Sequence, residues 1–285
     1  MGWTIEVLIV DNGSTDDTRA VISDASSGNS LIRYLSEPAA GVSRARNRGL
    51  RESAGKVILF TDDDVRVPTH WLKGMCEKIL KGEADAVAGG IIFPAHIAYA
   101  FHEKPLNARR GWFASSDYLN PDNPKSMIGA NMAFSRRVLE KVPGFDLELG
   151  PGGVGSGEET LFCKQLRTAG YRLAGALNVT VEHHFDLRRT SREALLELAR
   201  IKGRTAAFIL YHWEHQPVPL HIPKLGIFHL ARQLVRLISK AGQSVERRTF
   251  GGLLRFEEKV TFLEEYRRQQ KRSRKYAHHG LTPLT

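Results

Sequence analysis

The sequence predicts an α/β fold in which a mostly parallel β-sheet is flanked by helices, followed by a helical C-terminal extension. Two observations predict it. In the first half of the chain, short runs rich in β-branched and apolar residues alternate with stretches of helical periodicity. Towards the C-terminus only the helical pattern continues. We therefore expect one domain over residues 1–215 and a basic amphipathic helical extension over residues 216–285.

The first half contains four expected strands separated by helices. A capping box of Ser14 and Asp17 is expected to start the first helix. The expected strands are Ile5–Val10, Leu31–Leu35, Val57–Thr61 and Ala86–Ile92, and the helices run from Ser14 to about Ala25, from about Ser43 to Ser53, and from a cap at Thr69.

The second half begins with a polar stretch, 94–126, that we expect to be a loop. Helical patterns then return, and Gly170 is the expected C-terminal glycine of the second of them. The expected elements are a short helix from Ser135, a glycine-rich loop over Gly150–Gly157, a helix over Glu158–Ala169, a helix capped by Thr190 and Glu193, an apolar helix at Leu225–Ala241 and a strongly charged helix at Leu253–Lys275.

The composition is that of an ordinary globular protein. Of its 285 residues, 42% are apolar and 25% charged, which excludes a disordered chain or a fibrous repeat. Cys76 and Cys163 form no metal-binding pair and indicate a reducing compartment. No signal-peptide pattern and no uncharged apolar stretch of about 18 residues occurs. We expect a cytoplasmic protein, and peripheral contact with the cytoplasmic face of a membrane stays open.

The net charge of +10 fits nucleic acid, an anionic membrane or a phosphate-rich ligand. Basic residues gather near the C-terminus, as in Arg267–Lys275, but without interleaved aromatic residues, so nucleic acid is set aside. In Leu225–Ala241, Arg232, Arg236 and Lys240 are spaced four apart. This helix either lies on a membrane surface or packs on the protein with extended basic side chains.

Three consecutive aspartates, Asp62, Asp63 and Asp64, follow a strongly apolar strand. In open α/β sheets ligands bind at this edge, and such carboxylates repel one another unless a cation neutralises them. Mg²⁺ or Mn²⁺ is the natural partner, and a solvated acidic turn is the alternative. Asp11 ends the first strand, where it could accept hydrogen bonds from a base or ribose. Together the two strand ends predict a nucleotide site.

Further candidate groups lie in the second half. Glu158 and Glu159 begin a helix after the glycine-rich loop, and one of them could act as a general base. The alternative is that acidic residues simply favour a helix N-terminus. His183 could be a metal ligand, a phosphate partner or a structural histidine. Arg188 and Arg189 suit phosphate neutralisation, without specificity.

Four segments in order resemble the successive motifs of family 2 glycosyltransferases. They are VLIVDNGSTDDT, GVSRARNRGLRESAGKVILFTDDD, GANMAFSRRVLEKVPGFD and GSGEETLFCKQLRTAGYRL, and they cover most of the chain from Ile5 to Ser191. The resemblance implies a GT-A fold, which is Rossmann-like, and a nucleotide-sugar donor, with UDP-sugar as our expectation. It also implies Mn²⁺ or Mg²⁺ as cofactor and inversion at the anomeric carbon.

The resemblance also implies roles for individual residues by their position in the motifs. These are Asp11, Asn12, Arg44, Asp62 and Asp63 for the donor nucleotide, Asp62, Asp64 and His183 for the metal, Glu159 as catalytic base with Glu158 beside it, and Gly129 and Asn131 on the acceptor side.

One feature of the family has no match in this chain. Family members begin with a further strand and helix that carry a Pro-x-Tyr/Phe-Asn type motif, so we expect a unit of roughly 30 residues to be missing here. The expected acceptor is a saccharide or a lipid-linked molecule of the cell envelope. A nucleotidyltransferase acting on a sugar phosphate, or an inactive truncated relative acting as a binding module, are the alternatives.

Overall fold

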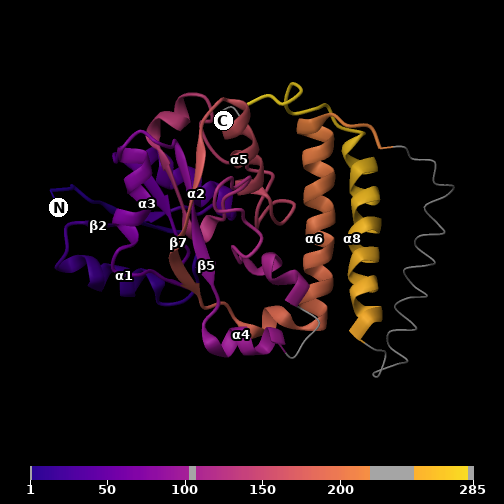
Figure 1. The fold of residues 1–285 in the computed structure, drawn as a ribbon, viewed down its shortest axis with the longest axis horizontal. Helices are drawn as coiled ribbons and strands as arrows, with labels where there is room; N and C mark the ends of the chain where they lie inside the picture. Colours follow the sequence, from indigo (N-terminus) through magenta and orange to yellow (C-terminus); the bar gives the residue numbers. More distant parts are fainter. Residues whose placement is uncertain (1, 103–106, 219–246, 282–285) are drawn as a thin grey trace. The chain divides into compact units, whose positions relative to one another are not determined.

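The computed structural model describes residues 2–102, 107–218 and 247–281. Two compact units are present, one of residues 1–92, 114–183 and 281–285, the other of residues 93–113 and 184–280. The first unit is α/β, and the described elements of the second are helical (Figure 1). The helix expected at Leu225–Ala241 lies outside the described residues.

The first unit contains both sheets. In chain order its elements are β1 (Val7–Asp11), α1 (Thr18–Ser27), β2 (Ile32–Ser36), α2 (Val42–Glu52), β3 (Val57–Phe60), β4 (Val65–Arg66), α3 (Trp71–Leu80), β5 (Ala86–Ile92), η2 (Gly129–Asn131), β6 (Met132–Ser135), η3 (Arg136–Glu140), α5 (Glu158–Thr168) and β7 (Leu173–His183). The four predicted strands all exist, and β5 has the predicted bounds.

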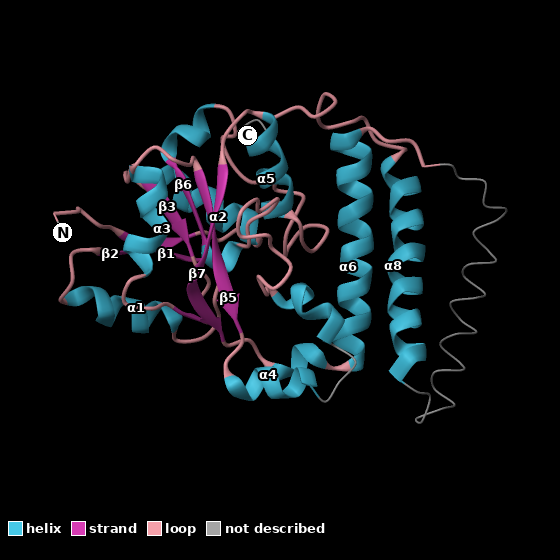
Figure 2. Ribbon diagram, viewed as in Figure 1, coloured by secondary structure: helices cyan, strands magenta, loops and turns pink. Residues whose placement is uncertain are grey.

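Two sheets form in this unit, a pair β1-β2 and a five-stranded sheet in the order β3-β6-β5-β7-β4 (Figure 2). Pairing is parallel between β1 and β2 and between β5 and β7. It is antiparallel where β6 lies between β3 and β5, and where β4 pairs with β7. The larger sheet is therefore mixed rather than mostly parallel, because β6 and β4 run against their neighbours.

Helix α1 begins later than the predicted capping box. Its N-cap is Asp17, without a side-chain bond, and the helix starts at Thr18. The backbone N–H of Ser14 donates to Asp11 Oδ1 (2.9 Å), so Ser14 belongs to a turn at the end of β1. Asp16 Oδ1 accepts from both the N–H and the hydroxyl of Thr18. The Ser14 cap was thus wrong, because the strand-end aspartate competes for its backbone.

Helix α2 buries a stripe of residues spaced three and four apart, Ser43, Asn47 and Leu50. The Ser43 hydroxyl donates to the carbonyl of Leu149 (2.9 Å). The amide of Asn47 donates to the carbonyl of Phe145 and accepts from its N–H, both at 2.8 Å. These side chains fasten the segment that leads to the glycine-rich loop and α5 onto α2.

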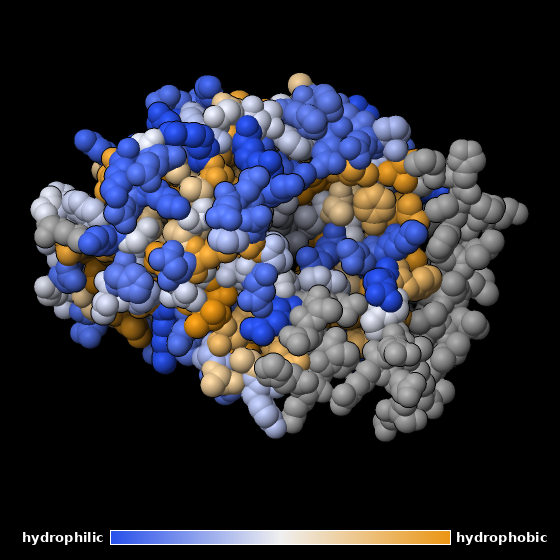
Figure 3. Space-filling model, in the orientation of Figure 1, coloured by the Kyte–Doolittle hydropathy of each residue, from blue (hydrophilic) through white to orange (hydrophobic). Residues whose placement is uncertain are grey.

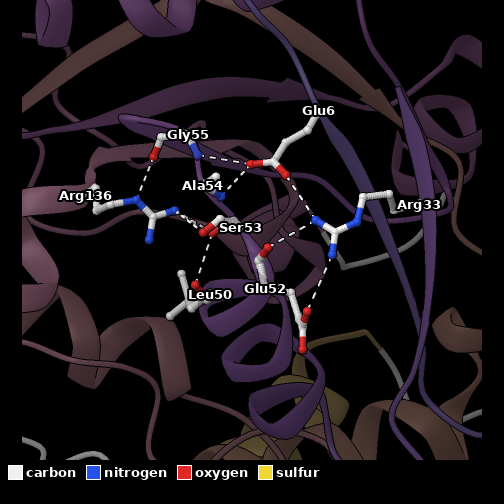
Figure 4. A network of polar contacts seen from close by, with 8 residues as sticks. All are labelled: Glu6, Arg33, Leu50, Glu52, Ser53, Ala54, Gly55 and Arg136. Carbon is white, nitrogen blue, oxygen red and sulfur yellow. Dashed lines mark hydrogen bonds and ion pairs between the residues drawn. The ribbon is translucent and has the colours of Figure 1, made fainter. Parts of the chain in front are cut away.

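A polar network joins the two sheets at the start of their strands (Figure 4). Glu6, just before β1, accepts hydrogen bonds from the backbone N–H groups of Ala54 (2.6 Å) and Gly55 (3.0 Å), just before β3. Its other oxygen pairs with Arg33 of β2 at 3.4 Å. Arg136, after β6, donates to the carbonyl of Gly55. Side chains, rather than a shared strand ladder, make these links.

The second unit is built from helices around a small aromatic core. Its described elements are α4 (Ala95–His102), η1 (Asn107–Phe113), η4 (Leu187–Thr190), α6 (Arg192–Ile209), a π-helical turn η5 (Leu210–Glu214) and α8 (Arg247–Gln269). Figure 1 shows α6 and α8 side by side, and they are in extensive contact. No helix among the described residues is long and apolar enough to cross a membrane.

Two predictions in this unit were wrong. The expected loop 94–126 contains α4, because Ile97 and Phe101, four residues apart, pack into a core with Phe93 and Phe185. The helix expected to be capped by Thr190 is capped one residue later, since the Ser191 hydroxyl accepts from the backbone N–H three residues on. The Thr190 hydroxyl instead donates to a backbone carbonyl of the preceding turn.

The cap expected for α3 was also wrong. Its N-cap is His70 rather than Thr69, and no side-chain hydrogen bond closes that end.

On the face of the molecule drawn in Figure 3, hydrophilic side chains surround smaller apolar patches, which is normal for a folded chain.

Candidate active site

The aspartate triplet and His183 lie at the same edge of the five-stranded sheet. β3 and β5 run in the same direction because both pair antiparallel with β6, and β5 is parallel to β7. Asp62, Asp63 and Asp64 follow the carboxyl end of β3, and His183 is the last residue of β7. The sheet therefore brings together the two segments that the sequence singled out.

The short strand β4 fixes Asp64 beside His183. In its register Val65 pairs with His183, so the preceding residue lies next to the histidine. Asp64 Oδ2 is 3.3 Å from His183 Nε2. The imidazole is almost fully buried, Asp64 is one-third exposed, and Asp63 is exposed to solvent. Asp62 interacts electrostatically with both Asp64 and His183.

The donor set of this edge fits a divalent metal only in part. Within the described ranges, no cluster of three or more histidine, cysteine or acidic side chains is preassembled for a metal ion. Asp64 and His183 are nevertheless adjacent, with Asp62 near them. Carboxylate oxygens suit Mg²⁺ and Mn²⁺, and Mg²⁺ is commonly held by one or two carboxylates plus substrate phosphates. These residues fit an ion whose coordination a bound diphosphate completes.

Asp11 ends β1 as a firmly ionised carboxylate. Oδ1 accepts from the N–H of Ser14 (2.9 Å), and Oδ2 accepts from the hydroxyl of Tyr34 on β2 (2.7 Å). Hydrogen bonds from Ser14, and next from Tyr34, lower the pKa of Asp11. The guanidinium of Arg19 stands over the Tyr34 ring. Asp11 is thus a fixed acceptor at a strand end.

The side chain of Asn12 holds a backbone turn by hydrogen bonds. Its amide nitrogen donates to the carbonyls of Glu37 and Ala39, both at 2.8 Å, and its oxygen accepts from the N–H of Gly41 at 2.7 Å. These bonds shape the turn that enters α2. Arg44 lies exposed in the first turn of that helix. Asn12 therefore controls where α2, and with it Arg44, begins.

Glu158 and Glu159 meet a buried arginine, Arg46 of α2. Arg46 Nη1 donates to Glu158 Oε1 at 2.7 Å and lies 3.8 Å from Glu159 Oε2. Its Nη2 lies 3.8 Å from Asp62 Oδ1. The guanidinium also stands over the ring of Phe145. One arginine thus connects the acidic helix start with the aspartates at the sheet edge.

The two neighbouring glutamates have different surroundings. Glu158 is buried, and its Oε2 has no hydrogen-bond partner among the described residues. The Glu159 side chain is 23% exposed. Burial, and next the charge of Glu158, raise the pKa of Glu159 to about 8, while Arg46 opposes the shift. Burial also raises the pKa of Asp62. Glu159 is therefore the glutamate that can reach a ligand and exchange a proton.

Gly129 and Asn131 are buried in the turn η2 that precedes β6. Asn131 is fully buried, donates to the carbonyls of Gly90 and Val179, and accepts from the indole N–H of Trp71 at 2.9 Å. Its amide is fully used in joining strands and α3. A side chain at Gly129 would collide with the Arg46 guanidinium. Gly129 thus leaves room for Arg46, and Asn131 holds the neighbouring strands together.

Sequence reasoning missed Arg46 and Tyr34. The signal for Arg46 was present, because it lies next to Asn47 and three residues from Ser43, on the helix stripe that is buried. A basic residue on such a stripe needs a buried acidic partner. Tyr34 gave no comparable signal, since its bond to Asp11 depends on the register of β1 against β2.

Comparison with known proteins gives a consistent family. The family model described as "Glycosyl transferase family 2" matches residues 3–143. Glycosyltransferase GlyA of Streptococcus pneumoniae is 30% identical over 99 residues, 35% of this chain and 13% of that protein. Glucosyl-dolichyl phosphate glucuronosyltransferase of Haloferax volcanii is 24% identical over 156 residues, 52% of this chain and 48% of that protein. The chain thus spans less than half the length of these curated relatives.

A solved structure supports the fold over a longer stretch. The mannosyltransferase PcManGT from Pyrobaculum calidifontis, in complex with GDP-Man and Mn²⁺, has a TM-score of 0.56 and 17% sequence identity to this chain. The likeness covers 91% of this chain and 77% of that one. It confirms the expected α/β GT-A fold. Residues 3–143, which carry most of the motifs, match glycosyl transferase family 2.

Proposed function

We propose that this chain transfers a sugar from a nucleotide-sugar donor to a hydroxyl acceptor, with inversion and with a divalent metal. The observation that carries the proposal is that Arg46 links Glu159 to Asp62 at the sheet edge. Glu159 is partly exposed, and its pKa is raised. The family match supports the same reaction, as does the fold shared with a mannosyltransferase solved with GDP-Man and Mn²⁺.

The donor nucleotide is proposed to bind along the edge that runs from β1 to β3. Asp11, held by two hydrogen bonds, would accept from the base, and Asp62 would face the ribose. Arg44 and Asp63 are exposed and can contact the nucleotide, whereas Asn12 would act through the turn that it holds. We propose a UDP-sugar as the donor, and this choice rests on the family resemblance.

Asp64 and His183, with Asp62, are proposed to hold Mn²⁺ or Mg²⁺ together with the donor diphosphate. When bound, the ion would neutralise the charge that develops on the departing diphosphate. The residues of this chain supply the fixed carboxylates and the imidazole. The register of β4 against β7 keeps them in place before the ligand arrives.

Glu159 is proposed as the general base. It would take the proton of the acceptor hydroxyl while that oxygen attacks the anomeric carbon and the bond to the nucleoside diphosphate breaks. One displacement of this kind inverts the anomeric carbon. The raised pKa of Glu159 suits the task, since a base acts best when its pKa lies near the working pH.

The acceptor is proposed to be a saccharide or a lipid-linked molecule of the cell envelope. The similarity to a relative that is named for glucosyl-dolichyl phosphate supports a lipid-linked acceptor. Gly129 and Asn131 would shape the acceptor side indirectly, since both are buried.

Two further proposals rest on the sequence alone. They are the division of the chain at residue 215 and membrane contact by its basic C-terminal part.

A titration of thermal stability with Mn²⁺ and a panel of nucleoside diphosphates tests the donor site. A ligand that binds only the folded state raises the melting temperature. We expect a rise with one nucleoside diphosphate that requires Mn²⁺, followed by transfer from the corresponding nucleotide sugar. A shift with a nucleoside triphosphate and sugar phosphate, with diphosphate release, would instead identify a nucleotidyltransferase. Absence of any Mn²⁺-dependent shift would contradict the proposal.

A further inference from the structure

Arg46 is the centre of the charged cluster described above. Only 10% of its side chain is exposed, and three carboxylates lie within 4 Å of its guanidinium. They come from separate segments, namely Asp62 after β3 and Glu158 and Glu159 at the start of α5. A buried guanidinium keeps its charge, so the cluster holds one permanent cation among three acidic groups.

The contacts of Arg46 divide into one close pair and two longer ones. The pair with Glu158 is a direct hydrogen bond of 2.7 Å between two buried side chains. Glu159 and Asp62 each lie 3.8 Å from the guanidinium, which is ion-pair distance without a direct hydrogen bond. Glu158 thus anchors the guanidinium, which in turn attracts the proposed base on one side and a proposed metal ligand on the other.

The surrounding backbone is shaped for this arginine. Any side chain at Gly129 would overlap Arg46 Nη2. A side chain at Gly150 would lie 3.0 Å from Glu158 Oε2, and the positive φ of 82° at Gly150 also favours glycine. The guanidinium carbon of Arg46 lies 5.6 Å from the centre of the Phe145 ring. The two glycines therefore leave room for the Arg46 guanidinium and its Glu158 partner, and the Phe145 ring lies against the guanidinium.

We propose that Arg46 is a positioning residue with two opposed effects: it holds Glu159 in the orientation for transfer, and as a cation beside Asp62 it weakens binding of a divalent metal. The first effect rests on the proposed transfer reaction, and the second rests only on the proposed metal site. If Arg46 only filled space or stabilised the fold, its replacement in a variant that still folds would change neither the turnover nor the affinity for a metal ion. The opposed directions make the proposal testable.

The single variant Arg46→Met is a poor test, because it leaves Glu158 buried without its partner and can prevent folding. The double variant Arg46→Met with Glu158→Gln removes both charges of the buried pair and keeps the net charge. A buried ion pair replaced as a unit often leaves stability unchanged. Its melting temperature and far-ultraviolet circular dichroism report whether the fold is retained, and Arg46→Lys serves as the conservative variant.

Turnover of the double variant separates positioning from structure. We expect kcat to fall about 10²-fold with KM for the donor little changed, because a small misplacement of a base has an effect of that size. Arg46→Lys should recover part of this loss, since it keeps the charge near Glu159. If the folded double variant turns over at the wild-type rate, the pair matters only for the fold and the proposal is overturned.

Binding of Mn²⁺ alone, followed by electron paramagnetic resonance of the free ion, tests the second effect without any turnover. We expect the double variant to bind Mn²⁺ ~3-fold more tightly than wild type, because the lost cation lies 3.8 Å from Asp62, whereas the lost Glu158 charge is bonded to the other nitrogen of the guanidinium. Equal or weaker binding overturns the proposal. If wild type transfers no sugar from any donor, the proposed function fails, and the Mn²⁺ result still decides this second effect.

Discussion

Glu158 and Glu159 show how much neighbouring residues can differ. Both start α5, but Glu158 turns inward to Arg46, whereas the side chain of Glu159 stays 23% exposed. Burial and the adjacent charge raise the pKa of Glu159. The buried partner thus makes its neighbour a better proton acceptor near neutral pH.

The role of Glu159 is tested by Glu159→Gln. This variant keeps shape and hydrogen-bonding capacity but cannot accept the proton, so we expect turnover to fall by roughly 10²-fold or more. Binding of Mn²⁺ and nucleoside diphosphate should stay near the wild-type value in calorimetry. Glu140→Gln, at an exposed position of η3, is the matched control and should change neither quantity. Turnover that survives in Glu159→Gln would remove Glu159 from the mechanism.

The raised pKa of Glu159 also predicts a pH dependence of stability. The folded chain binds this proton more tightly than the unfolded chain, whose pKa is near the ordinary 4.5, so the free energy of unfolding falls as pH rises from that value to about 8. Glu159→Gln lacks this term. We expect the variant to gain stability relative to wild type between about pH 5 and about pH 9 in urea unfolding. A difference independent of pH would be inconsistent with the shift.

At the scale of elements, the glycine-rich loop before α5 is packed against the start of α2. The N–H of Val42 donates to the carbonyl of Pro151, and Gly152 lies so close that a Cβ there would be 2.7 Å from the Cα of Gly41. The loop therefore carries α5, with its two glutamates, up to the helix that carries Arg46. Contact between these two elements assembles the site.

Gly152→Ala tests this contact, and Gly82→Ala is its control. Both glycines have positive φ, 94° and 71°, so an alanine is strained in each, at a cost of roughly 1–2 kcal/mol. Only at Gly152 does the new methyl group also meet backbone atoms. We expect Gly152→Ala to lose more stability in urea unfolding than Gly82→Ala, and to lose turnover as well. Equal losses would show that the loop tolerates displacement from α2.

The same elements show what the sequence could predict. The run Ala86–Ile92 is a strand with the predicted bounds, and α5 starts at Glu158 and ends before Gly170, whose φ is positive, as expected. Periodicity and glycine position determine such features locally. Helix starts were less predictable, because the backbone N–H of Ser14 donates to the Asp11 carboxylate and the Thr190 hydroxyl donates to the carbonyl of Leu187, so that neither residue caps the helix that follows.

Most residues of the candidate site could be predicted from the sequence, but the contacts between them could not. Asp64 and His183 were both singled out, but their contact depends on β4, a two-residue strand without a sequence signal. Arg46 was missed because its partners lie in α5 and after β3, far away in the chain. The acceptor-side role of Asn131 stays a prediction, and the contacts of its buried amide, which joins two strands, were not predictable from the sequence.

At the scale of the whole molecule, all the proposed site residues fall in the first compact unit. The α/β class followed from alternating strands and helices. The mixed pairing did not, because β6 is short and inserts between strands that precede it in the chain. The split into two sheets was also not predictable. Asp11 therefore reaches the rest of the site through side chains and helix α2 rather than through a shared ladder.

Glu6 is the natural place to test how the two sheets depend on each other. It accepts from the N–H groups of Ala54 and Gly55 and pairs with Arg33, so Glu6→Ala should cost roughly 1–3 kcal/mol. We expect hydrogen exchange to quicken more in β1 and β2 than in β5, because the larger sheet keeps its ladder. The exposed Glu83→Ala is the control. Equal loss of protection in β1 and β5 would mean that the two sheets open as one cooperative body, so that the side-chain network is not what separates their stabilities.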